Sequence, residues 1–261
     1  MKKNLFTLLT VFGLAGLFSA CSSDGDKTID LVEIAGPAEI IGAWKLDVEY
    51  QPDEEGWFDV MVVMPLSMKW ERKEGVEDKD FSVHVMNTDI IGEDAANLGG
   101  TFMSESLLKV LNKITFHSDV TITAEYADGS KDGSEEAVDI IWKESSKSLV
   151  SYHYKSKTQI LVDLHLDEII READIKDQKM IDLMEEFLSE PIPVNYKRTD
   201  NKLSLYLGLD FLGPILDKML PLVKDLPLDE AMKTMVNGIV DQIPGLMENT
   251  EVFEISLNLK K

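Results

Sequence analysis

Apolar and polar residues alternate over many short stretches of this 261-residue chain, and this alternation is the strongest restriction on its fold. A two-residue period is typical of a strand with one buried face and one exposed face. Turn dipeptides such as Asp128-Gly129 separate many of the stretches. About eleven strands are predicted, over residues 44–50, 57–64, 69–72, 81–86, 120–126, 138–142, 149–154, 160–166, 194–198, 203–209 and 252–259.

Apolar residues at helical spacing lie between the predicted strands. The predicted helices cover residues 104–112, 180–188, 211–223 and 228–243, and Pro244 with Gly245 ends the last one. A hairpin followed by a helical stretch recurs at residues 150–190 and 194–248. This recurrence is either a true repeat or a chance similarity between two alternating hairpins.

Together these elements predict a mainly β fold with inserted helices, of the α+β class. Antiparallel strands that each have one apolar face must bury those faces together. We therefore expect the meander to close as a barrel or wrapped sheet, or to pack as a sandwich. A strand at residues 252–259 suits a barrel that is closed by its last strand.

The first residues have the layout of a bacterial export signal. Lys2 and Lys3 precede an apolar run over residues 5–17, which is shorter than the roughly 20 residues of a membrane-spanning helix. The run ends in Ser19-Ala20-Cys21, which resembles a lipobox. The resemblance implies a lipoprotein signal peptide over residues 1–20 and a lipid anchor on Cys21. The alternative is an ordinary signal peptide or a short buried helix.

Residues 21–37 are predicted to form a flexible, lipidated tether, because residues 22–28 are small, polar and acidic. This stretch also resembles the acidic export signals of surface lipoproteins in Bacteroidetes. We expect an outer-membrane lipoprotein, at the periplasmic face or the cell surface, that contacts the membrane only through its anchor. Cys21 is the only cysteine, so an internal disulfide and a Cys-based zinc site are excluded.

The charge balance argues against nucleic acids and anionic lipid surfaces as partners. The chain has 48 Asp and Glu against 26 Lys and Arg, a net charge of −22. Nucleic-acid binding needs basic patches, and anionic lipid surfaces also attract basic segments, so neither partner is expected. A hydrophobic fraction of 44% is that of a globular protein.

Gly42-Ala43-Trp44, at the start of the first predicted strand, resembles the Gly-x-Trp opening of lipocalin-like proteins. With the lipobox and the meander, the chain resembles the lipocalin-like (calycin-like) lipoproteins of Bacteroidetes over residues 38–261. The resemblance implies a barrel of eight to ten strands whose apolar interior could hold a small ligand. Lipocalins usually place an arginine near the last strand, against that tryptophan; here the chain ends in Leu259-Lys260-Lys261.

Asp163, His165 and Asp167 are the best candidates for chemistry, because residues two apart in a strand share a face. Two carboxylates and an imidazole could hold a divalent cation or act as an acid–base group in a hydrolase. The alternative is the solvated face of a strand, and we favour it. We therefore expect no catalytic residues, no metal and no cofactor.

Methionines gather on the predicted helices, and methionine is favoured on adaptable apolar binding surfaces. Met219, Met232 and Met235, together with Ile239 and Trp44, are the candidate contacts for a small ligand. The alternative is that these side chains fill the core against the sheet.

The predicted function is therefore non-enzymatic. A cell-envelope lipoprotein would bind a small apolar or amphipathic ligand in a β-barrel pocket covered by amphipathic helices. The alternative is a surface interaction or scaffold lipoprotein that has a filled core and binds a protein or glycan partner.

Overall fold

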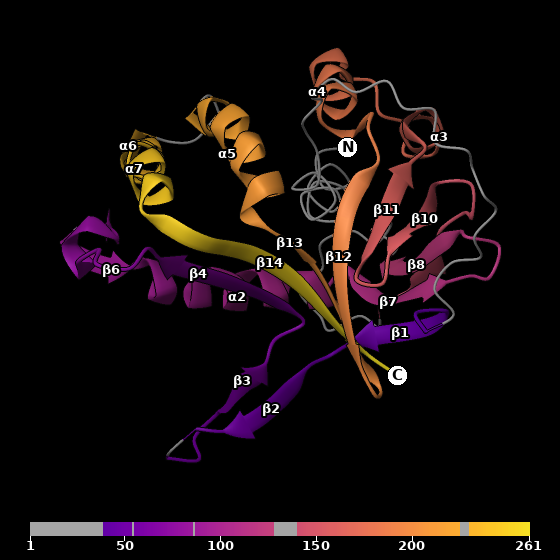
Figure 1. The fold of residues 1–261 in the computed structure, drawn as a ribbon, viewed down its shortest axis with the longest axis horizontal. Coiled ribbons are helices and arrows are strands. Elements are labelled where there is room, and N and C mark those ends of the chain that lie inside the picture. The colour runs from indigo at the N-terminus through magenta and orange to yellow at the C-terminus, as the bar shows by residue number, and fades with distance from the viewer. Residues whose placement is uncertain (1–38, 54, 86, 128–139, 225–229) are drawn as a thin grey trace.

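The computed structural model describes residues 39–53, 55–85, 87–127, 140–224 and 230–261. In this part of the chain a ten-stranded antiparallel sheet carries inserted helices, which confirms the predicted mainly β fold (Figure 1). The signal peptide, Cys21 and the tether lie outside the described residues, as does the start of the strand predicted at 138–142.

The strands of the large sheet are β1 (Gly42–Leu46), β4 (Leu66–Arg72), β7 (Leu111–Phe116), β8 (Ile122–Ala127), β9 (Trp142–Glu144), β10 (Val150–Ser156), β11 (Gln159–Leu164), β12 (Ile192–Thr199), β13 (Lys202–Leu207) and β14 (Thr250–Lys260). Two separate hairpins pair β2 (Glu49–Pro52) with β3 (Asp59–Val63) and β5 (Ser82–Val85) with β6 (Thr88–Ile91). The helices are η1 (Asp78–Asp80), α2 (Gly92–Leu108), α3 (Leu166–Glu172), α4 (Gln178–Leu188), α5 (Leu209–Lys224), α6 (Glu230–Val240) and α7 (Ile243–Glu248). No helix within the described residues is both long and apolar enough to span a membrane.

Strand β14 lies in the middle of the large sheet. It pairs with β13 along one edge and with β1 and β4, one after the other, along its other edge. Two strands share this edge because the chain leaves the sheet after Leu46 and returns at Leu66. The β2–β3 hairpin is formed between these two points.

The predicted closure into a barrel is wrong. The last strand, which was expected to close it, is the central strand, because it has partners on both edges. The strand order begins at β10 and ends at β9. An isolated bridge between Thr121 and Ser151, and a hydrogen bond from Tyr152 N to Val120 O (2.9 Å), bring β10 to the β7–β8 turn without a continuous ladder.

The main core fills the inner side of the curved sheet. Trp44, Phe116 and Tyr152 are buried there, and the rings of Phe116 and Tyr152 meet edge to face at 5.4 Å. Aliphatic side chains from the other strands and from α5 complete it: Leu46, Ile160, Leu203, Leu207, Leu212 and Leu259. These buried side chains pack against one another in one cluster.

Trp44 joins the first strand to the end of β14. Its indole N–H donates to Ile40 O at 2.7 Å, and Lys261 Nζ lies 4.5 Å from the centre of its ring. A cation over an aromatic face is stabilising.

The hairpin-and-helix order predicted at 150–190 and 194–248 is visible in the structure. The β10–β11 hairpin precedes α3 and α4, and the β12–β13 hairpin precedes α5, α6 and α7. Strands β11 and β12 pair with each other, so both hairpins belong to one sheet. A true repeat stays a prediction, because this order alone does not separate it from chance similarity.

The helix predicted at 104–112 is the C-terminal part of a longer helix, α2, and its predicted end belongs to β7. The first half of α2 contains Gly99 and Gly100, which have low helix propensity and conceal the pattern. Both glycines let α2 lie close to β4: a Cβ on Gly99 would meet Met68 Sδ at 3.2 Å, and one on Gly100 would meet Leu66 O at 3.4 Å.

Ser104 attaches α2 to the outer edge of β4. Its buried hydroxyl accepts a hydrogen bond from Leu66 N (3.1 Å) and donates one to Leu66 O (2.8 Å). Both backbone groups point away from β14, so without Ser104 they would lack a partner inside the protein.

We expect Ser104→Ala to lower the free energy of unfolding by about 2 kcal/mol, because it leaves a buried N–H and C=O unpaired. Urea unfolding followed by circular dichroism measures the change. The matched control is Ser106→Ala, whose hydroxyl bonds only Phe102 O on the exposed side of α2. An equal effect of both substitutions would contradict this role for Ser104.

Candidate functional site

Residues 48–64 form an arm that leaves the large sheet between β1 and β4. Its strands β2 and β3 pair only with each other in the described structure, as a two-stranded sheet. Figure 1 shows this arm extending away from the rest of the molecule. An isolated two-stranded hairpin is marginally stable in water, so the arm depends on its base.

The backbone of Asn258 on β14 holds both ends of the arm. Asp47 N donates to Asn258 O at 2.9 Å where the chain leaves the sheet, and Asn258 N donates to Pro65 O at 2.7 Å where it returns. These two bonds fix the distance between the two ends of the arm.

The side chain of Asn258 completes the attachment. Its Nδ2 donates to Met64 O (3.0 Å) and Ser67 Oγ (2.9 Å), and its Oδ1 accepts from Ser204 Oγ (2.9 Å). An asparagine thus links β13, β14 and the last residue of the arm, using a donor and an acceptor on one side chain.

Asp47, at the start of the arm, is buried between two lysines. Lys202 Nζ lies 2.8 Å from its Oδ2, and Lys260 Nζ lies 3.1 Å from its Oδ1. Burial alone would raise the pKa of Asp47, but the hydrogen bonds and charges of both lysines outweigh burial and lower the pKa from 3.8. The carboxylate is therefore ionised in the folded protein.

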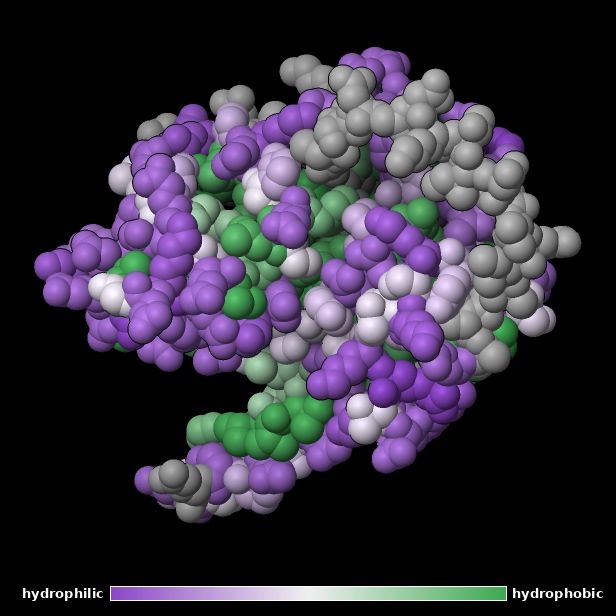
Figure 2. All heavy atoms as spheres, in the orientation of Figure 1, coloured by the Kyte–Doolittle hydropathy of each residue, from purple (hydrophilic) through white to green (hydrophobic). Residues whose placement is uncertain are grey.

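The surface of the arm is apolar. The large exposed side chains on it are Trp57 (80% exposed), Phe58 (65%), Tyr50 (52%), Val62 (44%) and Val60 (38%). Figure 2 shows an apolar strip along the arm, which a notch separates from the body. Contiguous exposed apolar surface on a soluble domain marks an interaction site.

At the tip of the arm, Asp53 bonds to the residues that follow Gly56. Asp53 Oδ1 accepts from Trp57 N (2.6 Å) and Phe58 N (3.3 Å), and Gly56, at φ +72°, supplies the positive φ of the turn. These bonds fix the backbone that carries the two most exposed aromatic side chains of the arm. A partner would therefore lose little backbone entropy by ordering the tip.

The arm carries negative charge only. Glu49, Asp53, Glu54, Glu55 and Asp59 lie within residues 48–64, and this segment contains no Lys or Arg. Together with the aromatic tip, these acids make the arm an apolar surface with an acidic margin.

The structure separates the three residues predicted to share a strand face. Asp163 lies on β11, His165 precedes the first turn of α3, and Asp167 is exposed within that turn. His153 Nε2 lies 2.9 Å from Asp163 Oδ2, and Ser151 Oγ lies 3.0 Å from His165 Nε2. Asp163 thus contacts His153 rather than completing a chain through His165 to Ser151.

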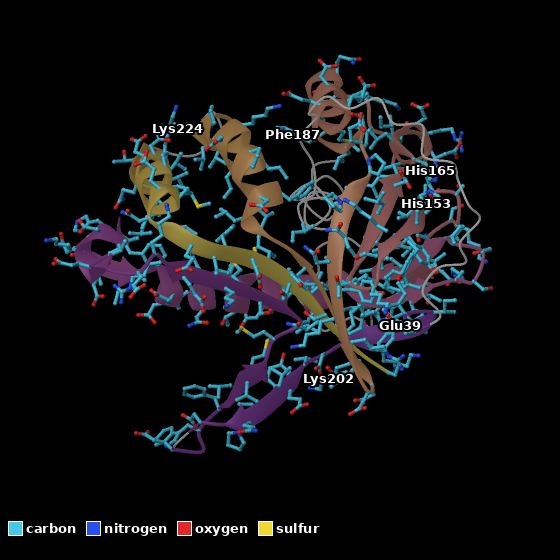
Figure 3. All side chains as sticks on the ribbon, in the orientation of Figure 1. Glu39, His153, His165, Phe187, Lys202 and Lys224 are labelled. Atoms are coloured by element: carbon cyan, nitrogen blue, oxygen red, sulfur yellow. The ribbon has the colours of Figure 1, made fainter. Side chains whose placement is uncertain are left out.

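The protonation of Asp163 depends on its burial and on two nearby histidines. Burial raises the pKa of Asp163 from 3.8, and the two nearby histidines offset only part of that effect. Among the described residues, no three His, Cys, Asp or Glu side chains gather as metal ligands. His153 and His165 lie together on β10 and before α3, far from Lys202 at the base of the arm (Figure 3).

The predicted ligand contacts are not brought together. Trp44 is in the main core, whereas Ile239 on α6 packs in a separate cluster with Phe81 and Leu246. Met219 lies in α5, and Met232 and Met235 lie in α6; their side chains are outside the described structure.

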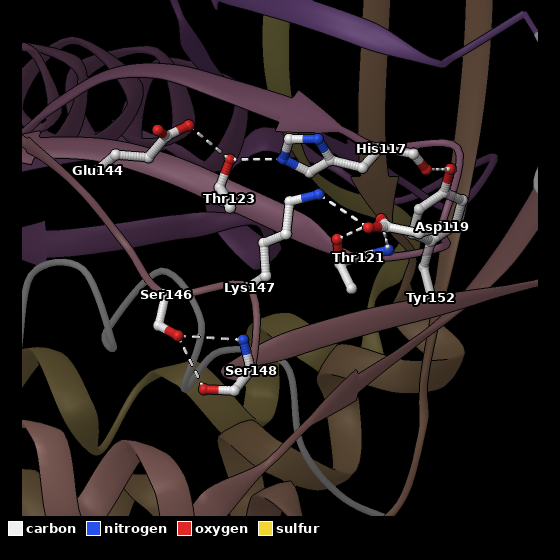
Figure 4. Close-up of polar contacts among 9 residues, drawn as sticks. All are labelled: His117, Asp119, Thr121, Thr123, Glu144, Ser146, Lys147, Ser148 and Tyr152. Carbon is white, nitrogen blue, oxygen red and sulfur yellow. Dashed lines mark hydrogen bonds and ion pairs between the residues drawn. The ribbon is translucent and has the colours of Figure 1, made fainter.

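A polar network orders the end of the sheet. Thr123 Oγ1 donates to Glu144 Oε1 (3.0 Å) and lies 2.9 Å from His117 Nε2, while Tyr152 Oη donates to His117 O at 3.0 Å (Figure 4). Thr123 is buried, so this network joins β8 and β9 to β10 rather than facing a ligand.

Comparison of the chain with protein families, curated proteins and solved structures found no match. The function is therefore inferred from the geometry of the described residues. The sequence predicted strands on both sides of the tip of the arm, at residues 44–50 and 57–64, but not their projection from the sheet. The alternation of β3 is the same in a covered and an uncovered hairpin, so no sequence signal separates the two.

We expect Asp47→Asn to lower the free energy of unfolding at pH 7 by about 2 kcal/mol, because its buried ion pairs with two lysines are lost. The folded-state pKa of Asp47 lies below its unfolded value, so the stabilisation is complete above pH 4 and is lost as the pH falls through the folded-state pKa. Urea unfolding between pH 7 and pH 3 measures this. Glu49→Gln is the control, because Glu49 is exposed and 3.9 Å from Lys202; a constant difference at all pH values would argue against the ion pairs.

Asp163→Asn should raise the melting temperature at pH 7. The folded-state pKa of Asp163 is raised, so its ionised form destabilises the fold above that pKa and has no effect below the unfolded value. The gain should therefore disappear at pH 3 in thermal unfolding. Asp167→Asn, in the first turn of α3, should bring no gain at either pH, because the helix dipole favours a negative charge there. A loss of stability in Asp163→Asn at pH 7 would refute this interpretation.

Proposed function

We propose that this chain is a non-enzymatic lipoprotein of the bacterial cell envelope that binds a partner protein through its arm. The observation that carries this proposal is the exposed apolar surface of residues 48–64, with Trp57 and Phe58 at its tip. Exposed aromatic side chains on an ordered turn are typical binding anchors. The acidic margin of the arm favours a partner with basic residues.

The filled core favours this function over a small-ligand carrier. Trp44, Tyr152 and Ile160 are fully buried against their neighbours on the inner side of the sheet. The carrier proposed from the lipocalin-like resemblance needs that space for its ligand. Trp44, a candidate ligand contact, is fully buried with Lys261 over its ring.

The predicted anchor is consistent with this role. A lipid on Cys21 and a tether over residues 21–37 would hold the domain near the outer membrane while leaving it free to turn. The partner would then be a protein of the same envelope or of the cell exterior. Whether the domain lies at the periplasmic face or at the cell surface stays open.

Site-specific photo-crosslinking in the producing bacterium tests the proposal. A photoreactive phenylalanine analogue in place of Trp57 should form a discrete adduct with one protein, because that side chain is 80% exposed at the tip. The added substitution Phe58→Ser should reduce the yield about tenfold, because it removes a second anchor.

The control places the same analogue at Lys176, an exposed residue between α3 and α4 at the far end of the molecule from the arm. Little adduct is expected there. Equal adducts at both positions, or none at position 57, would refute partner binding through the arm.

A further inference from the structure

We infer that the free edge of β3 is a strand-addition site for an extended segment of the partner protein in which apolar side chains alternate with Lys or Arg. This inference rests on the proposed function and names the partner's chemistry. It is drawn from the edges of the arm, from the register of its two strands and from its charge.

The two edges of the arm differ. Strand β3, Asp-Val-Met-Val-Val, has neither the proline nor the lysine with which proteins protect an exposed edge. Strand β2 ends in Pro52, which cannot donate to a further ladder. The register shift leaves Val62 as an extra residue on β3, so the regular part of the β3 edge is residues 59–61. In the described structure β3 pairs with β2 alone, so its other edge is open to an added strand.

The register assigns a different character to each face of β3. Val60 lies opposite Gln51 and Val63 lies opposite Glu49, and Gln51 and Glu49 share a face of β2, so Val60 and Val63 share that face. Asp59 and Met61, opposite Pro52 and Tyr50, are on the other face. A strand beside β3 would place apolar side chains next to Val60 and Val63, and basic side chains on the face of Asp59.

Charge opposes a second copy of this chain as the occupant. Two arms paired through β3 would bring together ten acidic side chains, five from each arm, and no cation from residues 48–64. Like charges at close range in a sheet are destabilising. A cationic segment gains from the same five carboxylates, so charge complementarity selects it.

The length of the site follows from β3. Five residues in an antiparallel ladder span about 17 Å. Backbone hydrogen bonds would supply affinity at this edge, and the alternating side chains would supply specificity. Trp57 and Phe58 lie just beyond one end of the strand, where they can cover the terminus of the added segment.

The probe is a capped peptide of about eight residues that alternates valine and lysine, added to the full chain in a mild nonionic detergent. It should change the fluorescence of Trp57 and slow hydrogen exchange of the backbone amides of residues 59–63. The charge-reversed peptide, with glutamate in place of lysine, should bind at least tenfold more weakly.

Two variants with the same charge test the edge itself. Val60→Lys and Gln51→Lys add one lysine on the same face, on paired strands. Only position 60 adjoins the added strand, so Val60→Lys should weaken binding of the peptide at least tenfold and Gln51→Lys less than threefold. Hydrogen exchange of each variant without peptide shows that the β2–β3 pairing is retained.

Three outcomes would overturn the inference: no peptide binding, binding without slower exchange in residues 59–63, or equal weakening by both lysine variants. A dimer by light scattering, with residues 59–63 already protected in the absence of peptide, would identify a second copy as the occupant instead. An adduct at position 57 in cells without protection of β3 would leave the proposed function standing and remove strand addition. Protection of β3 by the peptide without any adduct in cells would support strand addition and refute the proposed function.

Discussion

The structure depends on the point where Asn258 joins two departing ends of the chain to β14. Its backbone binds Asp47 on one side of the gap and Pro65 on the other, and its amide binds the last residue of the arm and Ser204 on β13. The neighbouring carboxylate of Asp47 is buried with two lysines. Because these contacts close the gap in the sheet, the chain can project seventeen residues, 48–64, without opening the core.

The same junction explains how the arm keeps its shape while its aromatic side chains stay exposed. A two-stranded hairpin buries little apolar surface of its own, so its order comes from the fixed ends, from the ladder between β2 and β3, and from the Asp53 turn at its tip. A fold under selection for stability alone would cover Trp57 and Phe58. Their exposure on a well-formed turn is a departure from that expectation, and such departures mark function more often than defects.

The alternation of side chains was sufficient to predict most strands and the β-rich class, and apolar residues at helical spacing predicted α4, α5 and α6. It did not predict pairing, because β14 alternates in the same way whether it closes a barrel or lies between β13 and β4. The start of α2 escaped prediction because Gly99 and Gly100, which lie close to β4, have low helix propensity. Asp163 and His165 lie on β11 and before α3 rather than on one strand face, and their partners His153 and Ser151 come from another strand.

The central position of β14 also determines when the sheet can form during synthesis. This strand follows every other strand of the sheet in sequence, yet β1, β4 and β13 all pair with it. Synthesis in the N-to-C direction therefore delivers the central strand after the strands it pairs with, and contacts such as Leu46 with Leu259 span most of the chain. Such non-local pairing is intrinsically slow. The sheet of a nascent chain would remain open until residues 250–260 have left the ribosome.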